Sequence, residues 1–150
     1  MAEGPAYWLM KSEPAKYGFD DLVRDGRTAW DGVRNAQAAI FLKTMRLGDQ
    51  VLFYHSVVGL SIVGVAKVAR ESFPDPTDPT GRFVAVEITP MRALKKPVTL
   101  AQMRAEPALS AMTLFRQFRL SVTPITPQEW SLILRLGGES QGELSEGPPK

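Results

Sequence analysis

Runs of β-branched and aromatic residues in the middle of the chain constrain its fold more than any other feature. Segments 51–56 and 61–69 are rich in such residues and are separated by Gly59, and segment 83–89 reads Phe-Val-Ala-Val-Glu-Ile-Thr. Patterns of this kind are typical of strands joined by short turns. Gly64, inside the second run, predicts a bulge or the close approach of another backbone. The middle of the chain is therefore expected to form a sheet.

The flanking segments combine short strands with helices. Residues 7–11 suit a first strand that ends at Pro14, and Asn35 is a good N-cap for an amphipathic helix. Helices are expected at 19–25 before Gly26, 36–46 before Gly48, 100–104 after Thr99 and 127–136 after the capping-box residue Thr126, with further extended segments at 94–98, 119–122 and 125. Together these elements predict an α+β domain built around a mixed or antiparallel, partly closed β-barrel flanked by short helices.

The length of 150 residues fits one globular domain, residues 1–138, followed by a short acidic tail. Segment 139–150 is rich in Glu, Ser, Gly and Pro without apolar periodicity, so we expect it to be disordered. It holds one of the 18 basic and three of the 16 acidic residues, which leaves 17 basic and 13 acidic residues in the domain. The resulting net charge of +4 mildly favours phosphate contacts and fits an ordinary protein surface equally well.

Missing residue types exclude several classes of protein. The chain has no cysteine, so it can form neither a disulfide nor a thiolate metal site, and a reducing compartment is permitted. The first residues lack the features of a secretory signal, and no run approaches the roughly 20 apolar residues of a membrane span. We therefore expect a soluble protein that is cytoplasmic, or nuclear in a eukaryote, with no membrane partner and with a monomer favoured.

Enzyme signatures are weak in this sequence. Residues 59–64 lack the Lys and Ser or Thr of a phosphate-binding loop, and no G-x-S-x-G is present. A single histidine rules out a multi-histidine metal centre. Carboxylate pairs at Asp20-Asp21 and at Asp75 and Asp78 are possible Mg²⁺ ligands, although a helix N-terminus and solvated turn chemistry explain them more simply. We predict no metal, no cofactor and no catalytic residue.

Two short segments contain side chains that can bind a flat heterocycle. Trp-Asp-Gly-Val-Arg-Asn spans residues 30–35 and Phe-Tyr-His-Ser spans residues 53–56, and together they offer stacking faces with planar donors and acceptors. Trp30 is interpreted as a pocket wall rather than a core filler because polar residues surround it. Trp8 and Trp130 are expected in the core.

The same segments carry a family resemblance. Four motifs occur in order, at residues 7–14 (Tyr-Trp-Leu-Met-Lys-Ser-Glu-Pro), 30–35, 53–56 and 119–122 (Arg-Leu-Ser-Val). Over residues 7–136 the chain resembles the EVE domains of the PUA-like superfamily. The resemblance implies a small barrel-like domain with flanking helices that binds nucleic acid, DNA or RNA, and recognises modified bases. It also implies a structural kinship with the YTH readers of methylated adenine.

One segment departs from the family pattern. Members usually follow the Arg-Asn pair with an aromatic residue and Gln-Ala-Arg-Asn, whereas segment 36–40 of this chain is Ala-Gln-Ala-Ala-Ile. An aromatic wall and a basic residue are therefore missing. The consequence is a shallower pocket, a wall supplied by Tyr17 or Phe115 instead, or a preference for a different modification.

The residues and the resemblance together predict a set of site residues. The base-binding set is Trp30, Val33, Arg34, Asn35, Tyr54, His55, Ser56, Lys11, Ser12, Glu13, Arg119 and Ser121, and the candidate phosphate contacts are Arg24, Arg27, Lys43 and Arg46.

Two of these residues have two interpretations, and strand geometry bears on two more. His55 on its own is more typical of a partly buried histidine satisfied by a backbone group, whereas the resemblance places it at the pocket mouth with its neighbours. Glu13 would accept a hydrogen bond from an exocyclic amine or would pair with Arg34 or Arg119. Alternation along a strand would put Arg119 and Ser121 on one face, toward the ligand.

The predicted function is a binding module that accepts a flipped, modified base in an aromatic slot. One alternative is an enzyme acting on nucleic acid or nucleotides with Glu13 or His55 as acid-base catalyst. The other is a protein-interaction domain, whose mark would be an exposed apolar patch.

Overall fold

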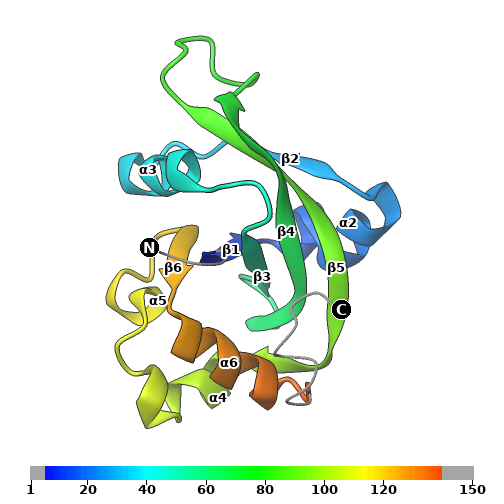
Figure 1. Ribbon diagram of the computed structural model, residues 1–150, viewed down its shortest axis with the longest axis vertical. Helices are drawn as coiled ribbons and strands as arrows, with labels where there is room; N and C mark the ends of the chain where they lie inside the picture. Colours follow the sequence, from blue (N-terminus) through cyan, green and yellow to red (C-terminus); the bar gives the residue numbers. More distant parts are fainter. Residues whose placement is uncertain (1–5, 140–150) are drawn as a thin grey trace.

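A six-stranded mixed sheet organises the computed structural model, which describes residues 6–139 (Figure 1). The strands are β1 (Tyr7–Ser12), β2 (Thr28–Trp30), β3 (Gln50–His55), β4 (Ser61–Pro74), β5 (Val84–Thr99) and β6 (Val122–Ile125). They lie in the order β2-β5-β4-β3-β1-β6, and only the β1–β3 pair is parallel among them. The α+β class is therefore confirmed, but the sheet is open, with β2 and β6 at its edges, instead of closing into a barrel.

Short helices cover this sheet. They are α1 (Pro14–Tyr17), α2 (Phe19–Asp25), α3 (Ala36–Thr44), α4 (Leu100–Arg104), the 3₁₀ helix η1 (Pro107–Leu109), α5 (Thr113–Arg116) and α6 (Pro127–Leu136). Capping confirms the predicted starts of α3, α4 and α6, where Asn35, Thr99 and Thr126 accept hydrogen bonds from backbone N–H groups. Among the described residues, none of the helices is long and apolar enough to cross a membrane.

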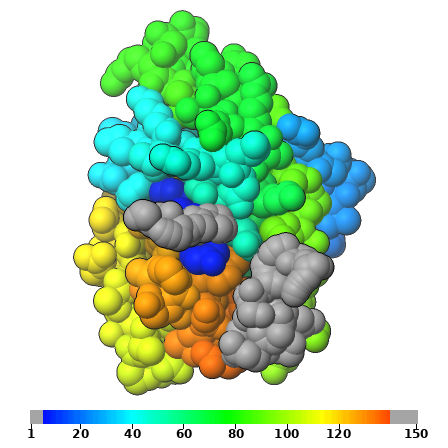
Figure 2. All heavy atoms as spheres, in the orientation of Figure 1, coloured from blue at the N-terminus to red at the C-terminus, as the bar shows by residue number. Residues whose placement is uncertain are grey.

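Each face of the sheet has its own hydrophobic core. Leu9, Leu52 and Tyr54 point into a cluster with residues of α4, α5 and α6, whereas Trp8 and Phe53 point into a cluster with α2 and α3. Figure 2 shows blue patches of the N-terminal segment with cyan residues on one side and orange residues on the other. A sheet buried on both faces explains why the strands read as continuous apolar runs rather than alternating ones. Trp8 and Trp130 lie in these cores, as predicted.

Several strand boundaries differ from expectation. The extended segments 83–89 and 94–98 are parts of one long strand, β5, and β4 continues past the expected end at 69. Repeated register shifts between β4 and β5 let the pair bend and run on without a break. Residues 119–121 precede β6, so the alternation argument for Arg119 and Ser121 does not hold.

Gly64 lies where the sheet meets the first helices. A Cβ atom built there would lie 2.5 Å from Cζ of Phe19, so the aromatic ring packs directly on the backbone of β4. The pairing register also shifts beside it, between Phe53 and Tyr54 and between Ile62 and Gly64. The predicted bulge is confirmed, and the close approach is made by a side chain rather than by another backbone.

The predicted tail begins inside the described structure. Glu139 is 5% exposed, and its carboxylate pairs with the guanidinium of Arg92 at 2.8 Å. The ion pair places Glu139 against β5, and the disorder of the tail stays a prediction. The rest of the predicted tail lies outside the described residues.

Candidate functional site

A pocket of about 880 Å³ opens where the C-terminal ends of β1 and β3 meet the segment between β2 and α3. Nine of the predicted base-binding residues line it: Lys11, Ser12, Glu13, Trp30, Val33, Arg34, Ser56, Arg119 and Ser121. Segments far apart in the sequence meet here because β1 and β3 are parallel neighbours that end together. Sequence reasoning missed five further lining residues as parts of the site. Lys16, Thr28 and Ala29 lie in the short elements α1 and β2, which give little periodic signal, and Asp31 and Gly32 were assigned only to a turn.

Trp30 forms an aromatic wall of this pocket. It is the last residue of β2, paired with Val86 of β5, and its side chain is half-buried. Its ring meets the fully buried ring of Phe53 edge-on, with centroids 5.7 Å apart and planes at 87°. Such an edge-to-face contact holds the indole in place from the core side. One side of Trp30 is therefore packed, and the residue also borders the pocket.

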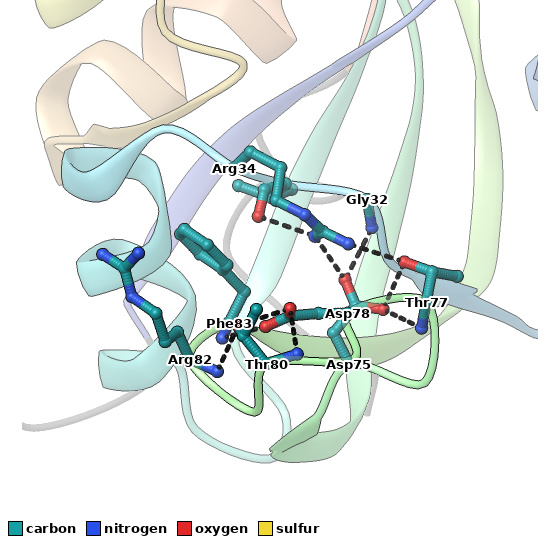
Figure 3. Close-up of polar contacts among 9 residues, drawn as sticks. Gly32, Arg34, Asp75, Thr77, Asp78, Thr80, Arg82 and Phe83 are labelled. Carbon is teal, nitrogen blue, oxygen red and sulfur yellow. Dashed lines mark hydrogen bonds and ion pairs between the residues drawn. The ribbon is translucent and has the colours of Figure 1, made fainter.

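Arg34 is held by a buried carboxylate on the loop between β4 and β5 (Figure 3). One Arg34 nitrogen donates to Oδ2 of Asp75 at 3.0 Å, and the other donates to Oγ1 of Thr77 at 3.0 Å. The backbone N–H of Gly32 donates to the same Asp75 oxygen at 2.7 Å. The Arg34 guanidinium also lies 5.2 Å from the Phe83 ring centroid. The guanidinium thus anchors the pocket wall formed by residues 32–34 to the β4–β5 loop.

The β4–β5 loop is an ordered turn rather than a solvated one. Asp75 and Asp78 are both buried, and each accepts hydrogen bonds from the threonine two residues later. Burial works to raise the pKa of Asp75, but hydrogen bonds from Thr77, Gly32 and Arg34 outweigh it and hold the pKa below its usual range. Hydrogen bonding by Thr80 lowers the pKa of Asp78 to about 2. The loop is a scaffold built on two charged carboxylates.

Asn35 does not line the pocket. Its Oδ1 accepts a hydrogen bond from the Ala38 N–H at 2.9 Å, which makes it the N-cap of α3. The predicted cap is confirmed, and it engages the amide oxygen of Asn35. The predicted contact of Asn35 with a base stays a prediction.

Tyr54 and His55 also lie outside the pocket lining. The Tyr54 ring is fully buried in the core beneath α4 and α5, and its hydroxyl has no hydrogen-bond partner in the described part of the chain. His55 Nε2 accepts a hydrogen bond from the Phe19 N–H at 3.1 Å, and burial lowers its pKa, so the ring is neutral near pH 7. The interpretation of His55 as a histidine satisfied by a backbone group is confirmed. Strand alternation separates the motif, and only Ser56, after β3 ends, reaches the pocket.

Replacing Tyr54 by phenylalanine tests this placement. Tyr54→Phe removes a buried hydroxyl without a partner, so we expect the free energy of unfolding to stay the same or to rise by up to about 1 kcal/mol. Urea denaturation of the variant measures this change. A clear loss of stability would contradict the buried, unpartnered position of the hydroxyl.

Glu13 and Ser12 make local contacts at the pocket mouth. Glu13 pairs with Lys16 at 3.8 Å and with neither predicted arginine, so that predicted pairing is wrong. The Ser12 hydroxyl donates to the Tyr17 carbonyl oxygen at 2.5 Å. Tyr17 lines the pocket, as one reading of the missing aromatic wall predicted, whereas Phe115 packs against the core beneath α5.

Several polar groups at the pocket are left without a partner by the described part of the chain. Such groups are the indole N–H of Trp30, the carboxylate of Asp31, the hydroxyls of Ser56 and Ser121, and the guanidinium of Arg119. A carboxylate accepts from an exocyclic amine, hydroxyls both donate and accept, and a guanidinium donates to a carbonyl or phosphate. An aromatic wall beside such groups can hold a planar, polar ligand. Asp31 was assigned only to a turn by the sequence, although its position beside Trp30 was a usable signal.

The four predicted phosphate contacts are not gathered at the pocket. Arg24 pairs with Asp21 and Asp25, each at 2.9 Å, and Arg27 pairs with Glu87. Lys43 and Arg46 lie near the start of β3, which is about 16 Å from the pocket end of a six-residue strand. These positions do not support the predicted phosphate contacts. Arg24 and Arg27 face carboxylate partners, and Lys43 and Arg46 lie toward the other end of the sheet.

The described residues contain no cluster of three or more histidine, aspartate or glutamate side chains that could hold a metal ion. Asp21 instead accepts a hydrogen bond from the Gly18 N–H at the start of α2. Asp75 accepts hydrogen bonds from Gly32 and from its own loop, and Asp78 accepts them within the loop.

The open mixed sheet and the aromatic, polar pocket at its strand ends define a small ligand-binding domain. The family model of the EVE domain matches residues 6–136. The chain belongs to the EVE domain family. It is 37% identical to thymocyte nuclear protein 1 of Rattus norvegicus over an alignment that covers 87% of this chain and 73% of the relative.

Solved structures have the same fold. A protein of Rhodopseudomonas palustris, solved by NMR, is 49% identical, with a TM-score of 0.85 over 89% of this chain and 93% of that one. Human thymocyte nuclear protein 1, in complex with DNA containing 5-methylcytosine, is 32% identical, with a TM-score of 0.82 over 90% of this chain and 99% of that one. A YTH domain of Zygosaccharomyces rouxii, at 16% identity and a TM-score of 0.58 over 94% of each chain, shares the fold.

Proposed function

We propose that this protein binds nucleic acid and reads a modified base held in the pocket against Trp30. The observation that carries the proposal is the half-buried indole, fixed edge-on by Phe53 beside polar groups that have no partner among residues 6–139. The human relative in complex with DNA containing 5-methylcytosine supports it, because that protein is 32% identical over nearly its whole solved chain.

The pocket chemistry explains how a base would be recognised. Stacking on an indole is worth about 1–3 kcal/mol and tolerates any base, so identity has to come from the polar edge. Asp31 is placed to accept from an exocyclic amine, and Ser56 and Ser121 can donate to ring nitrogens or carbonyls. Extruding a base from a duplex costs a few kcal/mol, which these contacts have to offset. This arrangement would be a binding site rather than a catalytic one. The monomeric state and the cytoplasmic or nuclear location remain predictions.

Trp30→Ala tests the proposal. We expect the variant to bind a single-stranded DNA with one central 5-methylcytosine roughly 5- to 100-fold more weakly, because the stacking face is lost. Isothermal titration calorimetry measures the dissociation constant. The matched control is Phe73→Ala, which removes another half-buried aromatic residue of the sheet that lies outside the pocket. Unchanged affinity in Trp30→Ala, or equal losses in the two variants, would refute the proposed reader function.

A further inference from the structure

An exposed phenylalanine surrounded by cations adjoins the pocket. Phe118 is 42% exposed, and its ring centroid lies 4.1 Å from Nζ of Lys11 and 5.9 Å from the guanidinium carbon of Arg104. Nζ of Lys11 also donates to the Phe118 carbonyl oxygen, which ties this residue to the end of β1. We call Lys11, Arg104, Phe118 and Arg119 the Phe118 ledge.

The ledge is continuous with the base-binding pocket. Lys11 and Arg119 belong to both, because each lines the pocket and lies beside Phe118 in space or in sequence. Phe118 and Arg104 extend the surface away from the pocket over the segment between α4 and β6. A polymer with one unit in the pocket would meet this surface with its next units.

The charges of the ledge are available to a ligand. Arg104 and Arg119 are exposed, and neither pairs with a carboxylate in the part of the chain that the structure describes. Glu106, the acidic residue of segment 104–119, accepts from the Ala108 N–H and caps η1. By contrast, Arg24 and Arg27, which do not line the pocket, pair with carboxylates: Arg24 with Asp21 and Asp25, and Arg27 with Glu87. The ledge therefore adds cations without a described carboxylate partner to the edge of the pocket.

Resting on the proposed reader function, we propose that the Phe118 ledge carries the nucleic-acid strand next to the bound base. Arg104 and Arg119 contact phosphates, and Phe118 stacks on a neighbouring base. Proteins that bind single-stranded nucleic acid without sequence preference combine aromatic rings, on which bases stack, with cations that contact phosphates. The Phe118 ledge has this combination. A stacking face of this kind is accessible only to an unpaired base, so the partner is single-stranded or locally opened.

Salt-dependent binding of an unmodified strand tests the ledge independently of base reading. The probe is a single-stranded oligothymidylate of about 12 nucleotides. Because each phosphate contact to a single strand adds about 0.7 to the slope of log K against log salt, the double variant Arg104→Gln, Arg119→Gln should lower the slope by about 1.4. Phe118→Ala should weaken binding roughly 5- to 100-fold at constant salt. Fluorescence anisotropy measures both quantities.

The control is the double variant Lys43→Gln, Arg46→Gln, which removes the same charge near the opposite end of β1 and β3. We expect its salt slope to equal that of the unchanged protein. The ledge proposal would be overturned if all three proteins had equal salt slopes, or if the control variant lost as much slope as the ledge variant. It would also be overturned if the unchanged protein did not bind the strand. If the ledge variants behaved as expected but the unchanged protein showed no preference for 5-methylcytosine, only base reading would be refuted.

Discussion

Phe53→Ala is expected to lower the free energy of unfolding by about 3–5 kcal/mol, the largest effect of any single substitution considered for this protein. The Phe53 ring is fully buried at the centre of the core beneath α2 and α3. It contacts three other rings, those of Phe19 at 5.4 Å, Trp30 at 5.7 Å and His55 at 5.8 Å. Truncation leaves a cavity that these neighbours can fill only by moving. Urea denaturation measures the loss.

A milder substitution separates stability from binding. Phe53→Leu keeps an apolar side chain in the core and should cost less than Phe53→Ala, while it removes the ring edge that supports Trp30. We expect the folded variant to bind a 5-methylcytosine oligonucleotide more weakly than the unchanged protein does. Full affinity in a folded Phe53→Leu variant would show that the indole needs no support from this ring.

Asp75→Ala is expected to destabilise the fold by about 1–3 kcal/mol, because buried donors lose their acceptor. Gly32 and Thr77 each donate a backbone N–H to the Asp75 carboxylate. Arg34 is 40% exposed, so water can solvate its freed charge, and this keeps the loss below that of a fully buried ion pair. Thermal unfolding followed by circular dichroism measures the change. A fall in base binding should accompany it, because residues 32–34 lose their anchor.

The same carboxylate predicts how stability depends on pH. The folded protein holds the pKa of Asp75 below the usual 3.8. The ionised carboxylate therefore stabilises the fold fully at pH values above 3.8, and this stabilisation is lost as the pH falls through the pKa of the folded state. Asp78, with a pKa of about 2, acts in the same direction. Stability should therefore fall as the pH drops below about 4. Asp75→Asn is the control, since it cannot ionise, and its stability should fall less steeply. An equal fall in both proteins would contradict this role.

Local chemistry made much of the fold predictable. Capping residues such as Asn35 and Thr126 define helix starts through contacts within four residues, so the starts of α3 and α6 could be predicted from sequence. The continuity of β5 could not, because register shifts against β4 come from long-range pairing. The open sheet likewise depends on which strands lie at the edges, a property that no short segment encodes.

The pocket was predictable to the extent that its residues follow strand ends. Ser12 and Ser56 were found because each ends a neighbouring strand, and Trp30 because polar residues flank it. Tyr54 was misplaced because both faces of the sheet are buried, so alternation puts it into a second core rather than into solvent. The Arg34 contact with Asp75 joins residues 41 positions apart, and nothing in the sequence pairs them.

The contact between Gly64 and Phe19 has a consequence for the divergence of this family. A methyl group at position 64 would overlap the ring, so any larger residue there has to be accommodated by a smaller one at position 19 or by a shift of α2. The two positions, 45 residues apart, are therefore expected to change together over evolutionary time. In a relative that has a larger residue at position 64 and keeps phenylalanine at position 19, we expect α2 to lie farther from the sheet. The residue that corresponds to Tyr17 should then border a pocket of different shape.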